Sequence, residues 1–388
     1  MHTERSIERE MPLARVPFSL LALVVGGSCL TAMSGTAITA ALPDIAAEFA
    51  GPQSELLSKL VLTIPAAFTA ASAPLFGSVI NRFGLSRTFA LGALLFAFAG
   101  VSGMFAIGIE HLIIGRAALG IAVAALLTAT MVLIGQNFTG REREWVLGLQ
   151  AAATSFGGMA LLLAGGLLAD YSWRITFAVY LIGLLILPLL AQPFPAAKKE
   201  AERHGHTDWR SLAHGCTALF LGANLFYVIP VQLPFALDVM TDSTPAWTGF
   251  ALAVCTFAGG VTGALFGVVR GLARPATLLG VSLLVISAGQ SLVTHLHYSA
   301  TLVGMVLSGI GVGMLLPATN SIVARAAVGR SRSRAVGIAA TCLFLAQFTA
   351  PLTATVLSAS GFGVFSASAM LTAAAGAAFL IAALRQED

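Results

Sequence analysis

Long apolar runs separated by short polar loops dominate the pattern of this chain. Each run approaches or exceeds the ~20 residues that an α-helix needs to cross a bilayer. The strands of a membrane β-barrel would be about half as long and would alternate in polarity, so helices are the interpretation that fits. Twelve runs meet this description: 17–42, 56–80, 88–109, 111–136, 146–169, 174–193, 211–237, 247–269, 275–294, 300–324, 336–359 and 364–384. The pattern predicts an all-α membrane protein with twelve transmembrane helices.

Composition points the same way. Of the 388 residues, 57% are hydrophobic and 10% are charged, whereas an ordinary soluble protein has about 25% charged residues. The formal net charge of +4 lies in short clusters between the apolar runs, which argues against a nucleic-acid partner. We predict no metal and no cofactor, because the cysteines fall inside apolar runs without metal-type spacing. These cysteines, expected to be packing residues, are Cys29, Cys216, Cys255 and Cys342.

The distribution of Lys and Arg predicts an orientation. The N-terminal tail and every second loop are basic, and the alternate loops hold only Lys59 and Arg174 beside several acids. By the positive-inside rule both termini are cytoplasmic, and an even number of helices requires the same arrangement. The first run, 17–42, is too long for the apolar region of a signal peptide, so we expect it to be retained as a spanning helix.

The chain also contains an internal repeat. Residues from 114 onward align without gaps with residues from 303 onward, and six predicted helices separate the two copies. The copies therefore share one topology, and we expect an axis along the membrane normal to relate them. This predicts a first six-helix half over 1–194, a cytoplasmic linker over 195–210 and a second half over 211–388. Identical pairs include Gly115/Gly304, Gly120/Gly309, Thr130/Thr319 and Arg141/Arg330.

One loop carries a family resemblance. The loop reading GSVINRFGLSR, residues 77–87, resembles the signature Gly-x-x-x-Asp-Arg-x-Gly-x-x-Arg of the major facilitator superfamily. Asn81 stands where that family usually has an acid. The resemblance implies a cytoplasmic gate in this loop, with a charge network weakened at Asn81. The positions that match the signature are Gly77, Arg82, Gly84 and Arg87.

Two further stretches extend the resemblance over nearly the whole chain. IIGRAALGIAVAA looks like the helix-4 signature of that family, and Arg116 is its arginine. GGLLADYSWRITF, residues 165–177, resembles drug–proton antiporters, although Leu161 and Leu162 stand where those exporters usually carry Gly-Pro. The resemblance implies the major facilitator fold, in which two pseudo-symmetric six-helix bundles enclose a cavity lined by helices 1, 4, 7 and 10.

Arg116 is a permanent charge inside a spanning run, which costs about 2.5–3.5 kcal/mol at a helix centre on insertion scales. Its counterpart in the repeat is Met305, so the fold does not require the charge. Arg116 could snorkel to the outer interface or hydrogen-bond backbone carbonyls between helices. We favour a second interpretation, in which Arg116 faces the cavity implied by the resemblance and binds an anionic or zwitterionic solute.

Other polar side chains join Arg116 on the helices implied to line the cavity, whereas no Asp or Glu lies in the middle of any run. The spacing of the three on the seventh run places them near one face of a helix. Interhelical hydrogen bonding, worth about 0.6 kcal/mol on average, is the alternative role for these groups. The predicted solute-binding residues are Arg116, Thr31, Ser34, Asn224, Tyr227, Gln232 and Asn320.

These features predict a transporter and not an enzyme, because the sequence has no Ser-His-Asp order and no intramembrane His–acid pair. We expect a monomeric secondary transporter of a bacterial inner membrane that exports a small anionic, zwitterionic or neutral organic solute by proton-coupled alternating access. Its expected partners are the solute, protons and the lipid bilayer. An importer or facilitator of organic anions on the same fold and a non-transporting membrane sensor are the alternatives.

Overall fold

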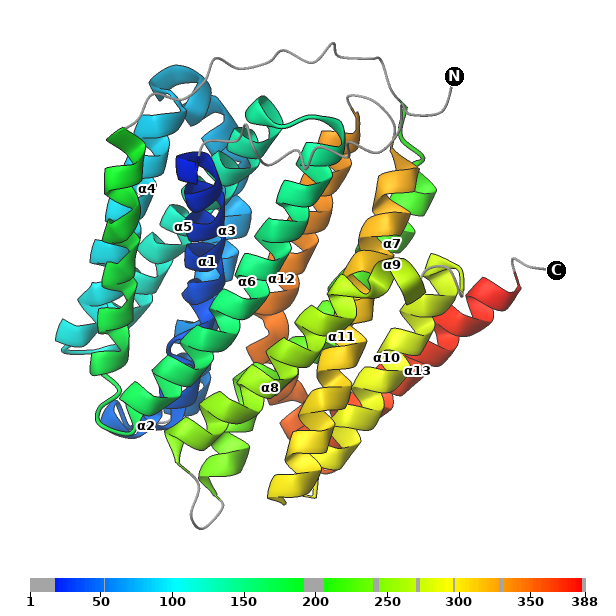
Figure 1. Cartoon of the computed structure of the whole chain (residues 1–388). Helices are drawn as coiled ribbons and strands as arrows, with labels where there is room; N and C mark the ends of the chain where they lie inside the picture. Colours follow the sequence, from blue (N-terminus) through cyan, green and yellow to red (C-terminus); the bar gives the residue numbers. More distant parts are fainter. Residues whose placement is uncertain are drawn as a thin grey trace, which may run out of the picture.

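The computed structural model of the chain describes residues 18–51, 53–191, 206–239, 244–269, 273–295, 297–327 and 331–385. They form a bundle of long helices that run side by side (Figure 1). The first half contains α1 (Phe18–Thr36), the 3₁₀ turn η2 (Thr39–Ala41), α2 (Leu42–Glu48), α3 (Ser54–Phe83), α4 (Leu85–Val101), η3 (Ser102–Phe105), α5 (Ile109–Asn137), α6 (Gly140–Ala169) and η4 (Ile175–Ala191). The second half contains α7 (Trp209–Asp238), α8 (Pro245–Ala264), α9 (Phe266–Val269), α10 (Pro275–Val293), α11 (Tyr298–Ala326), α12 (Ser331–Ser358) and α13 (Val364–Leu384).

The predicted membrane fold is confirmed. Among the described residues, 11 helical segments are long and apolar enough to cross a bilayer, and each overlaps one predicted run. The remaining run, 174–193, is occupied by η4, a 3₁₀ helix of 17 residues. A 3₁₀ helix rises about 2.0 Å per residue, so η4 extends over ~34 Å and also suffices for a hydrocarbon core of about 30 Å.

The two halves pack their helices in the same way. In the first half α5 packs against α3 and α4, and in the second half α11 packs against α8 and α10. The halves meet along two pairs, α6 with α8 and α3 with α12, which are equivalent under the predicted repeat. The boundaries at 194 and 211 stay predictions, because most of the linker over 195–210 lies outside the described residues.

The two ends of the bundle differ in how closely the halves approach. We call the end with Gly84 the Gly84 side (top of Figure 1) and the end with α2 and Asp170 the Asp170 side (bottom of Figure 1). At the Asp170 side α6 and α8 almost touch through glycine, because a Cβ atom on Gly166 would lie 3.1 Å from the Cα atom of Gly249. Larger side chains there would force the halves apart.

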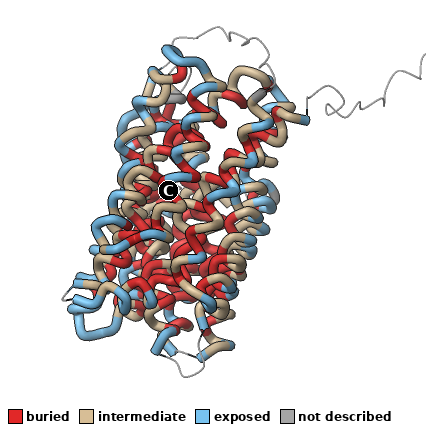
Figure 2. The backbone as a smooth tube through the Cα atoms, turned by 90° about the vertical axis from the view of Figure 1, so that its left-hand side faces the viewer, coloured by how far each residue is buried: buried red, intermediate tan, exposed pale blue. Residues whose placement is uncertain are grey.

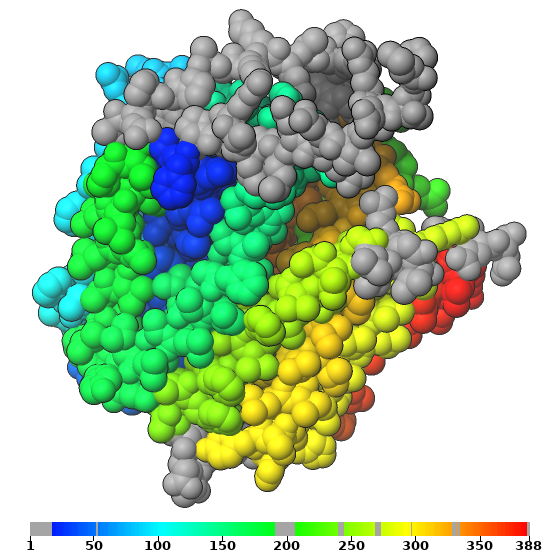
Figure 3. All heavy atoms as spheres, viewed as in Figure 1, coloured from blue at the N-terminus to red at the C-terminus, as the bar shows by residue number. Residues whose placement is uncertain are grey.

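Toward the Gly84 side, α6 and α12 are less closely packed. Among the described residues, no atom of another segment would lie within 4 Å of a Cβ atom on Gly148 of α6 or on its repeat counterpart Gly337 of α12. The space-filling view shows the surface hollowed between α6 and α11 in this region, with α12 at the back of the hollow (Figure 3). The bundle therefore joins its halves tightly at one end and more loosely at the other.

Burial follows the membrane pattern. Buried residues concentrate inside the bundle, and many exposed residues line its outside (Figure 2). Large apolar side chains such as Phe98, Leu185 and Val356 are among the exposed ones. Such a surface suits contact with lipid, where an apolar side chain gains nothing by being hidden.

Candidate functional site

Arg116 is one of the most deeply buried side chains of the described chain, with 1% of its surface exposed. It lies on α5, and its guanidinium donates hydrogen bonds to three different elements. Nε donates to the Val61 carbonyl of α3 over 3.0 Å, and Nη1 donates to the Tyr180 hydroxyl of η4 over 2.7 Å. Nη2 donates to the Ser34 carbonyl of α1. These bonds join α1, α3 and η4 to α5.

The local structure of α1 explains why its backbone accepts these bonds. The α-helix ends at Thr36, and the chain continues through a turn and η2 into α2. The last four carbonyls of an α-helix lack partners within the helix. Arg116 binds one of them at Ser34, and the Tyr180 hydroxyl donates to another, at Met33, over 3.3 Å. A cation at a helix C-terminus also interacts favourably with the helix dipole.

The sequence left two roles open for Arg116. The contacts observed are those of the structural role, in which Arg116 hydrogen-bonds backbone carbonyls between helices. Binding of a solute by Arg116 stays a prediction. The two predicted residues on α1 lie close to the broken helix end and are half-buried. The hydroxyl of Thr31 donates to the Ser28 carbonyl over 2.8 Å, and that of Ser34 donates to the Thr31 carbonyl over 3.1 Å.

The predicted residues Asn224 and Tyr227 of α7 meet polar side chains of α12. The Asn224 amide nitrogen donates to the Thr349 hydroxyl over 2.9 Å, and its amide oxygen accepts from Thr353 over 2.9 Å. The Tyr227 hydroxyl accepts a hydrogen bond from the Gln347 amide nitrogen. Gln347, Thr349 and Thr353 were not predicted, because polar residues on α12 match no signature in the sequence.

Among the contacts of the described residues, Gln232 is the one predicted residue with a polar side-chain contact between the halves. Its amide oxygen accepts a hydrogen bond of 2.6 Å from the ammonium of Lys59 on α3. The predicted loop position of Lys59 was wrong, because Lys59 lies within α3 and is 5% exposed. Glu55 four residues earlier was the available signal for a paired lysine inside a helix. Asn320 of α11, the last predicted residue, is exposed.

The predicted gate loop forms the turn between α3 and α4. Gly84 adopts a φ of 88°, which favours glycine, and its N–H donates to the Ile80 carbonyl over 2.8 Å. Gly77 is half-buried, whereas Asn81, Arg82 and Arg87 are exposed at the Gly84 side. The gating role of these residues stays a prediction.

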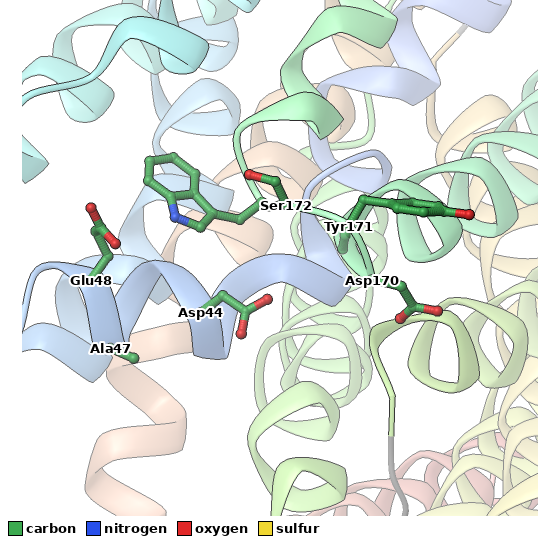
Figure 4. Close-up of a pocket in the computed structure, with 8 residues that line it drawn as sticks. Asp44, Ala47, Glu48, Asp170, Tyr171 and Ser172 are labelled. Atoms are coloured by element: carbon green, nitrogen blue, oxygen red, sulfur yellow. The ribbon is translucent and has the colours of Figure 1, made fainter.

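A separate cleft opens at the Asp170 side, next to α2 (Figure 4). It has a volume of about 480 Å³. Arg174 pairs with Glu48 over 3.2 Å at this end, and the Asp170 carboxylate accepts a hydrogen bond of 3.0 Å from the Ala246 N–H at the start of α8. The cleft is lined by Asp44, Ala47, Glu48, Ala169, Asp170, Tyr171, Ser172 and Trp173.

Over part of its length, the chain is similar to proteins that are named for drug resistance or drug efflux. It is 34% identical over 159 residues to a puromycin resistance protein of Streptomyces alboniger, covering 40% of this chain and 31% of that protein. It is 30% identical over 188 residues to the multidrug efflux pump LfrA of Mycolicibacterium smegmatis, covering 48% of this chain and 36% of that protein. The matched segments thus span about a third of these relatives.

A solved structure and a family model cover more of the chain. The crystal structure of a D-xylose-proton symporter superposes with a TM-score of 0.76 over 93% of this chain and 97% of that one, at 17% sequence identity. This likeness supports the fold. The model of the Major Facilitator Superfamily matches residues 24–296, which is most of the chain. The two bundles, the buried Arg116 and the Gly84 turn thus stand in a chain that belongs to the major facilitator superfamily of membrane transporters.

Proposed function

We propose that this chain is a secondary active exporter of a small organic solute, anionic, zwitterionic or neutral, that works by proton-coupled alternating access. The Gly84 side is cytoplasmic in this proposal, and a monomer in the inner membrane suffices. The names of the relatives, a puromycin resistance protein and a multidrug efflux pump, support export. The chain has the membrane helices and family membership that such a transporter needs.

The observation that carries the proposal is the difference between the two ends of the bundle. At the Asp170 side Gly166 packs against Gly249, and Asp170 binds the Ala246 N–H, so the halves are joined there. Toward the Gly84 side, no described residue fills the space next to Gly148 and Gly337. A transporter that alternates between two states has one closed end at a time, so this conformation would admit a solute from the Gly84 side.

We place the solute site between α1 of the first half and α7 of the second. Thr31 and Ser34 are half-buried on α1, and Tyr227 and Gln232 are half-buried on α7. Tyr227 also packs against an apolar cluster to which both halves contribute, including Leu30 of α1 and Val231 of α7, and this supports a place for it near the boundary of the halves. We infer that Arg116 acts on this site through α1, because its guanidinium holds the Ser34 carbonyl in the described conformation.

Transport into inside-out vesicles tests the proposal. Vesicles that contain the chain are given a panel of labelled organic anions, zwitterions and neutral compounds, with puromycin included because a relative is named for resistance to it. We expect uptake of at least one compound with an imposed pH gradient, and loss of that uptake when the gradient is collapsed. Uptake at a rate that does not depend on the pH gradient would favour a facilitator. Uptake in right-side-out vesicles would favour an importer.

No uptake of any compound in either orientation, by protein that is folded and correctly inserted, would favour the membrane sensor. Vesicles prepared from cells without the chain are the background control. A Tyr227→Phe variant sharpens the site assignment, because it removes only the hydroxyl that accepts from Gln347. We expect it to weaken solute binding more than it changes the maximal rate.

A further inference from the structure

Lys59 is a buried cation that the solute site proposed above does not use. Its side chain is 6% exposed. The ammonium donates to the Gln232 amide oxygen over 2.6 Å and to the Glu55 carboxylate, and lies 4.8 Å from the centre of the Phe235 ring. A buried ammonium is costly unless such partners replace its hydration. Gln232 and Phe235 belong to α7, so two of these three partners come from the other half.

The geometry around Lys59 does not follow from the packing of α3 alone. Glu55 lies one helical turn earlier on α3, and its side chain is 57% exposed. The flexible lysine could therefore pair with Glu55 in water, as exposed lysines commonly do. In the structure the ammonium keeps its contact with Glu55 and also lies inside the bundle against α7, although α3 meets the second half chiefly along α12. The buried position thus depends on the halves being together.

We propose that Lys59 is a charged latch of the transport cycle, which closes the Asp170 side by binding Gln232 and Phe235 across the two halves. This inference rests on the proposed alternating access. When the halves separate at this end, water solvates the ammonium and the contacts to α7 are lost. At the same end, the halves are also held together by the Gly166–Gly249 contact and by the hydrogen bond from the Ala246 N–H to Asp170.

A charged latch makes a prediction that an ordinary packing contact does not. Removing the partner, with Gln232→Leu, leaves the ammonium buried with one hydrogen bond fewer, so the closed state is destabilised while the open state is not. Removing the cation as well, with Lys59→Met and Gln232→Leu together, leaves an apolar contact and restores closure. The second substitution therefore reverses the effect of the first.

Labelling of a cysteine between the halves measures this effect. Val231 of α7 is 0% exposed and belongs to an apolar cluster made mostly of first-half residues, so Val231→Cys is protected while the halves are closed. In a background without the four native cysteines, a membrane-impermeant thiol reagent is applied from the Asp170 side, with no solute present. We expect Gln232→Leu to increase the labelling rate about tenfold, and the double variant to return it to the parent rate.

Gln232→Glu tests the same contact in the opposite direction, because a carboxylate would bind the ammonium more strongly. We expect slower labelling than in the parent. Arg174→Met is the matched control, since Arg174 pairs with Glu48 in the same half at the same end, and it should leave the rate unchanged. A Gln232→Leu protein that labels at the parent rate, or a double variant that stays as open as Gln232→Leu, would overturn the latch.

The labelling experiment needs no solute and no proton gradient. A failed latch with gradient-driven uptake would leave the proposed function standing. A working latch without uptake of any compound would show that the halves move although the solute or its coupling is assigned wrongly.

Discussion

The same position is a buried arginine in one half of the molecule and a buried methionine in the other. Arg116 of α5 is 1% exposed and Met305 of α11 is 0% exposed. The surrounding packing is shared, because a Cβ atom on Gly120 would collide with a carbonyl oxygen of α3, and one on its counterpart Gly309 would collide with a carbonyl oxygen of α8. The repeat thus conserves a close helix contact within this chain and varies the charge beside it.

The first helix of each half explains the difference. In the first half α1 stops at Thr36 inside the bundle, and Arg116 binds a carbonyl at its end. In the second half α7 continues as one α-helix over Trp209–Asp238, with Pro230 and Pro234 inside it, and Met305 packs in an apolar cluster. The comparison teaches that the buried charge accompanies a broken helix, whose free carbonyls replace the water that the guanidinium loses.

Met305→Arg should have the largest effect on stability. It places a guanidinium in the apolar cluster around Ile229 and Leu233, beside an α7 that has no broken end. We expect a loss of about 2.5–3.5 kcal/mol of stability, the cost of a central arginine on insertion scales. The yield of folded protein and its melting temperature in detergent measure the loss. Met305→Leu is the volume-matched control, and normal stability of Met305→Arg would contradict the explanation.

Arg116→Met copies the second half into the first and should have the next largest effect. It leaves the carbonyls of Ser34 and Val61 without their donor. A hydrogen bond to a charged group contributes about 1.5–3 kcal/mol, so we expect a loss in that range, together with loss of transport. Arg116→Lys should fall between Arg116→Met and the parent, since an ammonium lacks the planar fork that reaches several elements.

The same variants decide between the two roles of Arg116. A protein with Arg116→Met that melts like the parent and does not transport would favour the direct solute contact predicted from the sequence. Full stability together with full transport would refute both roles. Melting temperature and vesicle transport are therefore measured on the same purified variants.

Tyr180→Phe tests the smaller contribution to the end of α1, the hydrogen bond at the Met33 carbonyl. It removes the hydroxyl that accepts from Arg116 and donates to the Met33 carbonyl, and keeps the ring, whose centre lies 5.5 Å from that of Phe96. We expect a loss of about 1.5 kcal/mol, the lower end of the range for a hydrogen bond to a charged group. Tyr171→Phe, at a site that is 84% exposed, is the control and should melt like the parent.

The sequence predicted the spanning segments well, because apolar length alone decides them. It could not distinguish η4 from an α-helix, since both conformations bury the same apolar run and 3₁₀ structure has no hydropathy signal of its own. The break in α1 was also missed, because the turn at Ala37 and Ile38 contains neither glycine nor proline. Without that break, the carbonyl partners of Arg116 could not be foreseen.

Long-range contacts account for the other differences. Lys59 and Gln232 are 173 residues apart, and no local pattern relates them. The polar residues of α7 were recognised by their spacing on one face, whereas their partners Gln347, Thr349 and Thr353 on α12 could be identified only from how the helices pack. A single sequence reveals which side chains are unusual in a membrane more readily than it reveals their partners.

The start of α7 provides the smallest test of the comparison, because this continuous helix is stabilised at its N-terminus by a side chain. The Asp208 carboxylate accepts from the Ser211 hydroxyl over 2.6 Å and from the backbone N–H groups of Ser211 and Arg210. The Ser211 hydroxyl, followed by these N–H groups, lowers the pKa of Asp208 below its usual range. A lowered pKa in the folded state stabilises the protein above the pKa of the unfolded chain, and this contribution disappears as the pH falls through the folded value.

We expect Asp208→Ala to melt slightly below the parent at pH 7 and together with it in acid. Asp208→Asn retains a good N-cap without a titrating group, so its melting temperature at pH 7 should lie closer to the parent. An Asp208→Ala deficit that persists unchanged in acid would show that the carboxylate does not stabilise this helix end.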